Sequence, residues 1–483
     1  MKDDARAYRH ILKATALFGS VQGVQLLLSV VRTKMAAVLL GTQGVGILSL
    51  LTSTVNMIQS LTGLGIEKGG VRELATHKAD VSRISCIITA IRHWSWLSAL
   101  VGAFIMLLLA ENLSRWSFGD ARFTAAYLWL SVSLVLDTLT KGELGILQGL
   151  RQLRLLAKAN LVGSIVGLAV SLLLFHLWGI NGIVPAVVGS SVITFLAVVF
   201  AGRGRIIRGT PHPIAQTLKQ ERGVVQLGVM LTVGGFIATL SMYLINIFLS
   251  HKAGVNDVGL YRSGFNLIDK YVGLIIVAMV TDYYPRLSAV KNNRAKLNTE
   301  VNRQITVALL ILSPVVAVFI PLAPIIVRLL LSSEFAPIVP YISWAILGMV
   351  FKVPATAIAY VLIVRGNTRA YLITELLSWT TFVALHITGY LLHGLEGMGV
   401  AFLFSYVFYF VVIREYCWCK YRTMFNRSSS ESLGLVALSA FGSFVLCRCV
   451  VPVNPVVGYV GCGVLAVVSI WVCGLRLVGL IRK

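Results

Sequence analysis

Long apolar stretches, separated by short polar gaps, recur along the whole sequence. Most of them run to about 20 residues, the length that an α-helix needs to cross roughly 30 Å of hydrocarbon at 1.5 Å per residue. The pattern therefore predicts an all-α, polytopic membrane protein with about fourteen transmembrane helices. The expected spans are 14–40, 44–66, 84–110, 124–148, 156–178, 181–201, 223–249, 257–284, 304–331, 336–364, 370–392, 396–413, 433–451 and 455–475.

The composition agrees with this fold class. Of the 483 residues, 57% are apolar and only 13% are charged, too few ionic groups to cover the surface of a soluble enzyme. The net charge of +23 is also typical of proteins that bind nucleic acid. The distribution of the basic residues along the chain decides between these two interpretations.

The basic residues follow the gaps between the spans. With both termini in the cytoplasm, 29 Lys and Arg residues fall in the tails and the even-numbered gaps, and three fall on the opposite side, namely Arg115, Arg122 and Lys252. This imbalance obeys the positive-inside rule. It predicts a multi-pass protein with both termini cytoplasmic, and it explains the net charge without nucleic acid as a partner.

Sequence motifs for leader peptides, metals and catalysis are missing. Residues 1–13 are polar and mixed in charge, and the first apolar run is a full span without a small-residue cleavage site, so it is expected to stay in the membrane. The pairs Cys417/Cys419 and Cys447/Cys449 are spaced two residues apart, which points their thiols in different directions on a helix. No ATP-binding loop, zinc-protease helix or nucleophile elbow occurs. We expect neither an enzyme nor a cofactor nor a metal site.

Two glycine-rich turns occur twice at nearly the same offset. The pattern G-x-[QN]-x-V-G-[IL] at residues 41–47 returns at 254–260, 213 residues later. The turn at residues 179–183 matches that at 394–398, 215 residues later. Glycine suits tight turns of any origin, but two matches at one offset favour two parallel six-helix repeats around a central cavity.

The repeat also predicts how the chain is divided. The expected segments are an N-terminal six-helix half (1–202), a basic cytoplasmic linker (203–222), a C-terminal six-helix half (223–414), a second cytoplasmic linker (415–432) and two additional transmembrane helices (433–483).

Polar residues inside the spans are the candidates for function. A charge at the centre of a membrane helix costs roughly 2.5–3.5 kcal/mol, so such residues are expected to face water inside the protein. The candidates for substrate binding are Arg32, Lys34, Asn56, Lys141, Arg262, Lys270 and Lys352.

Arg32 has the best position among these candidates. It lies nine residues before Gly41, hence about 14 Å from the outer end of its helix and close to the membrane midplane. Gln22, Gln25 and Ser29 share its helical face. The next span carries a second polar stripe, formed by Ser49, Thr52, Ser53, Asn56 and Gln59.

The acidic residues Asp137, Asp269 and Glu375 are the candidates for ion coupling, because carboxylates within the membrane are the usual coupling sites. Asp269 shares a helical face with Arg262. Asp137 and Lys141 are four residues apart, so they can also form a plain structural pair that lowers the cost of both charges.

Several cations at mid-depth, beside amides and hydroxyls, predict a water-filled cavity that accepts an anion. Guanidinium and ammonium groups bind phosphates and diphosphates, and the polar stripes can hydrogen-bond to sugars. A channel for small anions could use the same charges, but the sequence contains nothing like a repeated filter ring.

The region around the first turn resembles a known family. Residues 29–50 (SVVRTKMAAVLLGTQGVGILSL), followed by GLGI at 63–66 and VREL at 71–74, are similar to the N-terminal pattern of Wzx-type O-antigen flippases. These are polysaccharide biosynthesis proteins of the multidrug/oligosaccharidyl-lipid/polysaccharide exporter superfamily. The resemblance is strong over residues 10–85 and continues to about residue 415 in helix number, repeat and inter-helix glycines. Many such flippases are described with twelve spans, whereas fourteen is closer to the lipid II flippases.

The resemblance implies a flippase in the bacterial inner (cytoplasmic) membrane. Its implied substrate is an oligosaccharide on a polyprenyl diphosphate, the repeat unit of an O-antigen or another surface polysaccharide, which moves to the periplasmic leaflet. Arg32 matches a cavity arginine of that superfamily. Alternating access by the two halves fits such cargo. The implied partners are this lipid, the membrane lipids, a coupling proton or sodium ion, and the polymerase and chain-length machinery.

Three other functions stay open from the sequence. A lipid II flippase would share the fold and mechanism but carry another head group. A small-solute or drug antiporter of the same superfamily would need an acidic or apolar cavity, which the excess of cations disfavours. A membrane polysaccharide polymerase or acyltransferase would need a large periplasmic loop, whereas the longest outer gap has about a dozen residues.

Overall fold

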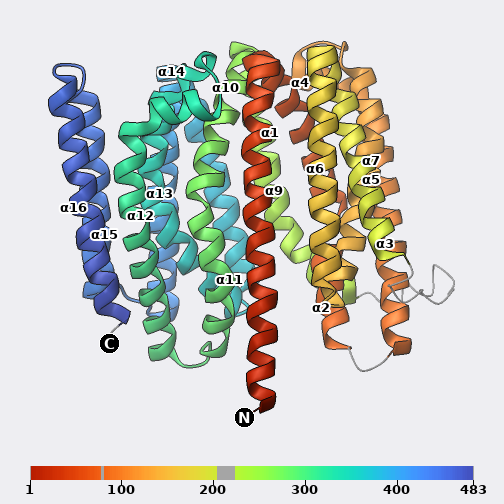
Figure 1. The fold of residues 1–483 in the computed structure, drawn as a ribbon, viewed down its shortest axis with the longest axis horizontal. Coiled ribbons are helices and arrows are strands. Elements are labelled where there is room, and N and C mark those ends of the chain that lie inside the picture. Colours follow the sequence, from red (N-terminus) through yellow and green to blue (C-terminus); the bar gives the residue numbers. More distant parts are fainter. Residues whose placement is uncertain (1, 78–80, 204–222, 482–483) are drawn as a thin grey trace. The chain divides into compact units, whose positions relative to one another are not determined.

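The computed structural model describes the backbone of residues 2–77, 81–203 and 223–481 (Figure 1). All regular structure within these ranges is helical, which confirms the all-α prediction. The chain forms two compact units, Met1–Gly259 and Leu260–Lys483. We describe each unit separately.

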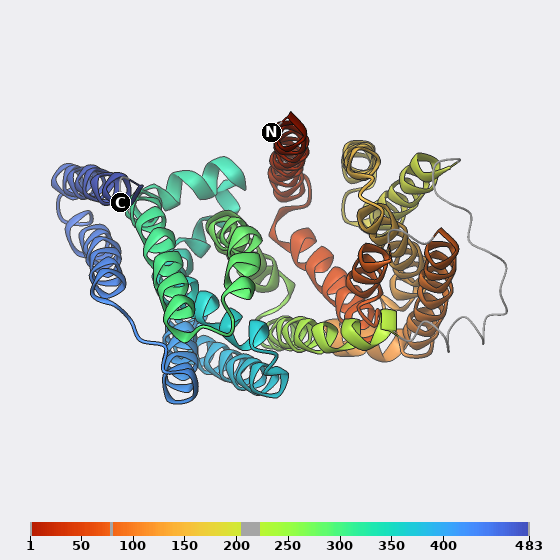
Figure 2. The same ribbon diagram turned by 90° about the horizontal axis from the view of Figure 1, so that it is seen from below.

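The first unit is a bundle of long helices, seen end-on in Figure 2. Its elements are α1 (Lys2–Thr62), α2 (Ile66–Thr76), α3 (Val81–Leu108), α4 (Ala110–Phe118), α5 (Thr124–Gly149), α6 (Leu153–Trp178), the short 3₁₀ helix η1 (Gly179–Gly182), α7 (Ile183–Gly202), α9 (Gly223–Ala253) and the start of α10 (Val255–Asn266).

The second unit continues along α10. Its further elements are the π-helical turn η2 (Leu267–Val272), α11 (Leu274–Ala289), α12 (Arg294–Leu330), η3 (Ser333–Ile338), α13 (Val339–Val364), α14 (Thr368–Tyr421), α15 (Arg427–Val445), η4 (Leu446–Val450) and α16 (Pro455–Ile481).

The described helices provide the fourteen predicted crossings. Nine helical stretches among the described residues are long and apolar enough to span a membrane. Three of these, Gly23–Thr62, Leu153–Gly202 and Thr368–Tyr421, each join two crossings at a glycine break. Two more spans carry more charge: α5, and the continuous run from α10 through α11. Together these segments fall at the fourteen expected places.

The glycine breaks support the predicted repeat. Gly41 and Gly254, at the first position of the two G-x-[QN]-x-V-G-[IL] turns, both have positive φ (64° and 92°). Gly179 and Gly394, which begin the second pair of turns, have φ/ψ of 52°/−127° and 57°/−141°. Only glycine adopts such angles without strain. Corresponding turns of the two halves therefore share an unusual backbone conformation.

The second pair of turns also makes the same close contact. A Cβ on Gly182 would collide with the carbonyl oxygen of Leu174, and a Cβ on Gly397 would collide with that of Gly389. Each contacted carbonyl lies eight residues earlier, on the preceding helix. The two helices that flank each turn thus approach at matching points, as a duplicated helical hairpin would.

The helices of the first unit pack around an apolar core near the predicted outer end. Its buried residues include Leu51 from α1, Tyr127 from α5 and Ile183 from α7. The Tyr127 hydroxyl donates to Ser117 Oγ at 2.9 Å and lies 3.2 Å from Thr54 Oγ1. This buried network joins α1, α4 and α5 at one end of the first unit. Each of its hydroxyl groups has a hydrogen-bond partner.

The last two helices form a hairpin that packs on α12, seen side by side in Figure 1. Ser313 of α12 lies 2.9 Å from both Ser439 of α15 and Ser469 of α16 through its hydroxyl. Arg448, in η4, forms an ion pair at 2.6 Å with Glu396 of α14. The hairpin is therefore held to the second unit by polar contacts at two levels.

The structure differs from the sequence reading in two respects. The short helices α2 and α4 lie where we expected only polar gaps. In addition, α9 packs on α1 and α2 and so belongs to the first compact unit, although it opens the predicted C-terminal half. The predicted segment boundaries follow the sequence repeat rather than the packing of the helices, and they stay a prediction. Residues 204–222 of the predicted linker lie outside the described residues.

Candidate functional site

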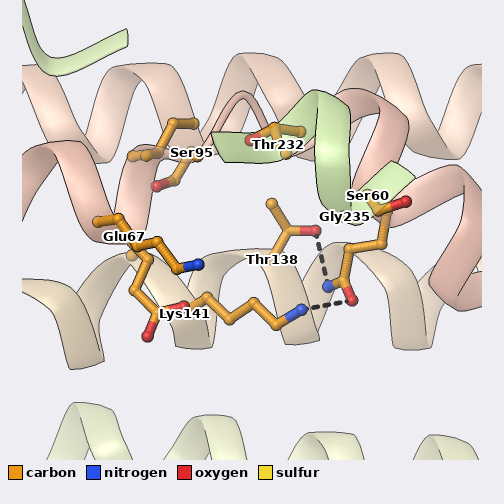
Figure 3. Close-up of a pocket in the computed structure, with 13 residues that line it drawn as sticks. Ser60, Glu67, Ser95, Thr138, Lys141, Thr232 and Gly235 are labelled. Carbon is orange, nitrogen blue, oxygen red and sulfur yellow. Dashed lines mark hydrogen bonds between the residues drawn. The ribbon is translucent and has the colours of Figure 1, made fainter. Parts of the chain in front are cut away.

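A polar cavity of about 240 Å³ lies within the first unit (Figure 3). It is enclosed by the second half of α1, the start of α2, α3, α5 and α9. Its polar and charged lining consists of Gln59, Ser60, Glu67, Lys68, Ser95, Thr138, Lys141 and Thr232. Of the residues predicted to bind substrate, Lys141 is the one that lines this cavity.

Lys141 extends along the cavity toward α1 (Figure 3). Its Nζ donates to Gln59 Oε1 at 2.7 Å, and Gln59 Nε2 donates to Thr138 Oγ1 at 3.3 Å. The Thr138 hydroxyl in turn donates to the carbonyl oxygen of Leu134 at 2.8 Å. This chain of donors fixes the orientation of the Gln59 amide, with its oxygen toward the ammonium.

The partner of Lys141 is a neutral amide, and this sets the charge of the site. Gln59 and Thr138 are 6% and 5% exposed, whereas Lys141 is exposed to the cavity. A neutral amide does not offset the charge of an ammonium, and it leaves donors for another acceptor. Glu67 and Lys68 also line the cavity, so the ionised lining carries one net positive charge.

Glycines allow the helices around the cavity to approach. A Cβ on Gly142 of α5 would collide with Ser95 Oγ of α3, and one on Gly145 would lie 3.2 Å from the Glu67 backbone of α2. The chain enters α2 through Leu64 and Gly65, both with positive φ (48° and 60°). These features place the first turn of α2, with its acidic and basic side chains, at the wall of the cavity.

A second lysine within a span, Lys352, lies in the second unit and is partly buried. Lys352 of α13 donates from Nζ to Asp269 Oδ1 of η2 at 2.8 Å. Its side chain is 16% exposed, and its Nζ lies 5.0 Å from the ring centroid of Tyr406. The ion pair and the aromatic face together stabilise a charge that would be costly to bury alone.

Lys141 and Lys352 occupy corresponding places in the two repeats. They lie on the fourth and tenth spans and are 211 residues apart. Their partners, Gln59 and Asp269, lie on the second and eighth spans and are 210 residues apart. Both separations are close to the 213- and 215-residue offsets of the turns. Each half thus links its fourth span to its second span through a lysine.

The predicted residues Arg32, Lys34 and Asn56 all lie on α1, outside the lining of the cavity. Arg32 and Asn56 are exposed, and Lys34 is partly buried. A role in substrate binding stays a prediction for all three.

Arg262 and Lys270 were also predicted to bind substrate. Arg262, on α10, is partly buried; its Nε has no hydrogen-bond partner among the described residues, and its Cζ lies 5.7 Å from the ring centroid of Phe265. The side chain of Lys270 lies outside the described residues. Of these two side chains, the structure therefore describes the surroundings of Arg262 alone.

The three candidate coupling carboxylates lie at separate places. Asp269 is half-exposed and paired with Lys352, which the sequence did not predict. Asp137 accepts a hydrogen bond from Ser133 at 3.4 Å and does not pair with Lys141 as we had considered, because the ammonium reaches across to α1 instead. Their role in ion coupling stays a prediction.

Glu375, the third of these carboxylates, accepts from Trp379 Nε1 at 3.1 Å and from the Tyr409 hydroxyl at 3.2 Å. Two aromatic donors thus satisfy a carboxylate within the apolar second unit. Ordinary helix spacing explains the Trp379 contact, which is four residues away, whereas Tyr409 comes from the other half of α14.

Sequence reasoning missed most of the cavity lining. Gln59 was part of a predicted polar stripe but was not singled out, although it is the residue that holds Lys141. Glu67 and Lys68 fell in a stretch read as a cytoplasmic gap. The left-handed residues Leu64 and Gly65 that turn α2 toward the bundle leave little signal beyond the glycine itself.

A family profile described as polysaccharide biosynthesis protein matches residues 35–340, well over half of the chain. This chain belongs to that family. The matched range contains the Lys141 cavity, Asp269 and both copies of the first glycine turn. It ends before Lys352, α14 and the C-terminal hairpin.

The chain is also similar to a curated flippase and to a solved flippase structure. The lipid III flippase of Escherichia coli (strain K12) is 23% identical over 388 residues, which cover 78% of this chain and 91% of that protein. The solved lipid II flippase MurJ, in an inward closed conformation, matches with a TM-score of 0.73 at 14% identity, over 97% of this chain and 100% of MurJ.

An inward-facing multidrug resistance MATE family transporter of the MOP superfamily also matches, with a TM-score of 0.69 at 17% identity, over 82% of this chain and 94% of that chain. These similarities establish that this chain has the fold of MOP superfamily transporters. The named relatives are flippases and transporters rather than enzymes.

Proposed function

We propose that this protein is a flippase for an oligosaccharide linked to polyprenyl diphosphate, and that the Lys141 cavity binds part of the head group. The observation that carries the proposal is the ammonium of Lys141, which is held in a polar cavity by the neutral amide of Gln59. Such a group has charge and donors available for a phosphate or an acidic sugar.

The size and lining of the cavity agree with this substrate. About 240 Å³ is below the range typical of sites for drug-sized ligands, so the cavity accommodates one portion of the head group, a diphosphate or a sugar. The amide and hydroxyl groups of Gln59, Ser60 and Thr138 can bind sugar hydroxyls. The lipid tail needs no polar site because it can stay in the bilayer.

The family and its relatives favour lipid-linked sugars over other cargo. The curated relative is named a lipid III flippase, and the solved relative with a TM-score of 0.73 is a lipid II flippase. We propose movement from the cytoplasmic to the periplasmic leaflet of the bacterial inner membrane by alternating access of two six-helix halves. The finer assignment is a repeat unit of O-antigen or another surface polysaccharide, with a proton or sodium ion as the coupling ion.

The decisive experiment measures transbilayer movement in proteoliposomes. Purified protein would be reconstituted with polyprenyl-diphosphate oligosaccharide, lipid II or a cationic drug, each with and without proton and sodium gradients. We expect movement of the oligosaccharide lipid. Movement of lipid II alone would change the substrate class, and movement of the drug alone would replace the flippase with a small-solute antiporter.

A variant tests the site within the same assay. Lys141→Met keeps the length of the side chain but removes its charge, and it should reduce the initial rate about tenfold or more, the loss of a hydrogen bond to a charged group. Lys158→Met is the matched control, because Lys158 is an exposed lysine on α6 outside the cavity lining. Equal rates in both variants would refute the assignment of the cavity while leaving the function intact.

A further inference from the structure

The C-terminal hairpin brings two cysteine side chains together. Cys447 lies in η4, at the end of α15, and Cys462 lies in α16; their Sγ atoms are 3.5 Å apart. Cys462 is 1% exposed and Cys447 is partly buried, whereas Cys449 is exposed. The thiols of Cys447 and Cys449 thus point in different directions, as their two-residue spacing predicts. One of them faces α16.

The packing of the hairpin places the two thiols opposite each other. A Cβ on Gly458 of α16 would lie 2.8 Å from the nitrogen and the Cα of Val451, so the two backbones come close at this point. Cys447 lies four residues before Val451, and Cys462 lies four residues after Gly458. In an antiparallel hairpin these positions face each other. The sulfur pair is therefore one helical turn away from a close approach of the backbones.

The turn that carries Cys447 is held on both sides. Its backbone is π-helical, because the Val451 N–H donates to the carbonyl oxygen of Leu446, five residues earlier, at 3.0 Å. Single turns of this kind often occur at functional sites. The next residue, Arg448, turns toward α14 and forms an ion pair with Glu396 at 2.6 Å. The adjacent thiol is thus kept on the side of α16.

This arrangement is close to the geometry of a disulfide bond. Such a bond has a sulfur–sulfur distance of about 2.05 Å and needs two helices whose backbones lie near each other. From 3.5 Å, each sulfur atom has to move by only about 0.7 Å, a distance that a modest rotation about each Cα–Cβ bond supplies. Neither helix has to shift.

The pair also lies near the predicted outer end of the hairpin. The turn between α15 and α16, residues 451–454, falls on the predicted periplasmic side. At 1.5 Å per residue, Cys447 is about 6 Å and Cys462 about 12 Å from this turn along the helices. Disulfides form and persist in the bacterial periplasm, whereas cytoplasmic thiols are kept reduced.

We propose that Cys447 and Cys462 form an intramolecular disulfide bond that joins α15 to α16 in the membrane. The oxidant is a protein disulfide on the periplasmic side. The Cys447 thiolate, the more exposed of the two, attacks one sulfur of that disulfide and releases the other as a thiolate. The Cys462 thiolate then attacks Cys447 Sγ and releases the second sulfur of the oxidant. Both protons pass to the oxidant, which leaves as a dithiol.

The bond gives the hairpin a covalent link beside its packing contacts. It closes a loop between residues 15 positions apart, and such a closure stabilises a fold mainly by restricting the unfolded chain. It also keeps α15 and α16 in one register, so that both present their serines to Ser313 of α12. The inference goes beyond the proposed function, because it concerns helices outside the repeat and no step of transport.

Trapping of thiols in intact cells tests for the bond. Growing cells would be quenched with acid, and their free thiols alkylated with N-ethylmaleimide in sodium dodecyl sulfate before purification. Mass spectrometry of the digested protein should find the Cys447 and Cys462 peptides linked, with reagent on the other five of the seven cysteines.

Three results of this experiment would overturn the proposal. The first is alkylation of both Cys447 and Cys462 in most molecules. The second is a bond that forms only when the trapping reagent is omitted, which is air oxidation after lysis. The third is a linked pair that contains Cys449 in place of Cys447.

Variants and a host strain sharpen the assignment. Cys449→Ser removes the exposed thiol of the same turn and, as the matched control, should keep the bond in the same fraction of molecules. Cys462→Ser should leave Cys447 alkylated. In cells that lack the periplasmic dithiol oxidase, the linked fraction of the wild type should fall at least fivefold. An unchanged fraction there would refute the periplasmic oxidant.

Thermal unfolding in detergent measures what the bond contributes. Reduction of the wild type with dithiothreitol should lower the unfolding midpoint by about 5 °C, whereas Cys462→Ser should give one midpoint with and without the reductant. Equal midpoints for the oxidised and the reduced wild type would contradict a stabilising link. All of these measurements omit the cargo, so a failed flippase assay leaves the disulfide standing, and a missing disulfide leaves the flippase standing.

Discussion

Lys141 and Lys352 hold corresponding places in the two halves of the chain, but they meet different partners. Lys141 donates to the Gln59 amide at 2.7 Å and faces a polar cavity. Lys352 donates to the Asp269 carboxylate at 2.8 Å and is only 16% exposed. In each half, a lysine on the fourth span thus donates to a residue on the second span. The acceptor differs: it is an amide in the first half and a carboxylate in the second.

This difference of one functional group changes what each lysine can do. A carboxylate neutralises the ammonium and forms an ion pair whose loss leaves an uncompensated charge. An amide orients the ammonium without neutralising it. We therefore propose anion binding for the lysine of the first unit and a structural role for the lysine of the second. Four changes test this contrast.

The largest expected effect is on the second lysine. Asp269→Asn leaves the charge of Lys352 unpaired, and it should lower the free energy of unfolding by about 2–3 kcal/mol. This is the lower end of the cost of removing one partner from a buried ion pair, because Asp269 is half-exposed. Thermal unfolding of the purified protein in detergent, followed by circular dichroism, measures this change.

The double variant Asp269→Asn/Lys352→Met is the control for that prediction, since removal of both charges should restore most of the stability and keep transport. A stable Asp269→Asn protein, or a stable double variant that no longer transports, would contradict a purely structural role for the pair.

Gln59→Glu should make the first site resemble the second. A carboxylate at this position would neutralise Lys141, and initial transport rates below saturation should fall about tenfold, equivalent to about 1.4 kcal/mol of substrate binding. Stability should be unchanged or higher. Gln148→Glu adds the same charge on an exposed part of α5 outside the cavity and should transport normally. Normal transport by Gln59→Glu would show that the charge of Lys141 is not used.

Glu67→Gln should act in the opposite direction. It removes the acidic group of the cavity lining and should strengthen binding of an anionic head group about fivefold, or about 1 kcal/mol. Equilibrium binding of the lipid-linked oligosaccharide to protein in detergent measures it, with Glu111→Gln on α4 as a control outside the cavity. Weaker binding would mean that Glu67 contacts the substrate as a hydrogen-bond acceptor.

The smallest expected effect concerns the support of Gln59. Thr138→Val keeps the shape of the side chain but removes the hydroxyl that accepts from Gln59 Nε2. A less well-oriented amide should reduce the transport rate about threefold, or about 0.7 kcal/mol, the net worth of one neutral hydrogen bond. Thr140→Val, whose hydroxyl donates only to the carbonyl of Leu136, is the matched control. A full loss of transport would assign Thr138 a direct contact with the substrate.

The sequence predicted the architecture well because membrane helices obey simple rules. The length of an apolar run sets the span, and the glycines at 41, 179, 254 and 394 marked turns that have the expected unusual backbone. The same reasoning missed α2, because a short amphipathic helix has no span-length signal. With α2 it missed Glu67 and Lys68 as cavity residues.

The site was predicted only in part, for a similar reason. The cost of burying charge pointed to Lys141, Lys352 and Asp269. It did not indicate partners: Lys141 donates to Gln59 on another helix rather than to Asp137, the nearest candidate in sequence. Partners on helices that are distant in sequence depend on packing, which in this case is set by small residues such as Gly142 and Gly145.

The sequence by itself determined the fold class, the number of spans, the repeat and the set of costly polar residues, because lipid penalises each of these features locally. Only the tertiary structure decided which lysine pairs with a carboxylate and which with an amide. It also decided that Cys447 and Cys462 face each other across the C-terminal hairpin. Both depend on which backbones approach closely, and that is a property of the packed helices rather than of any one segment.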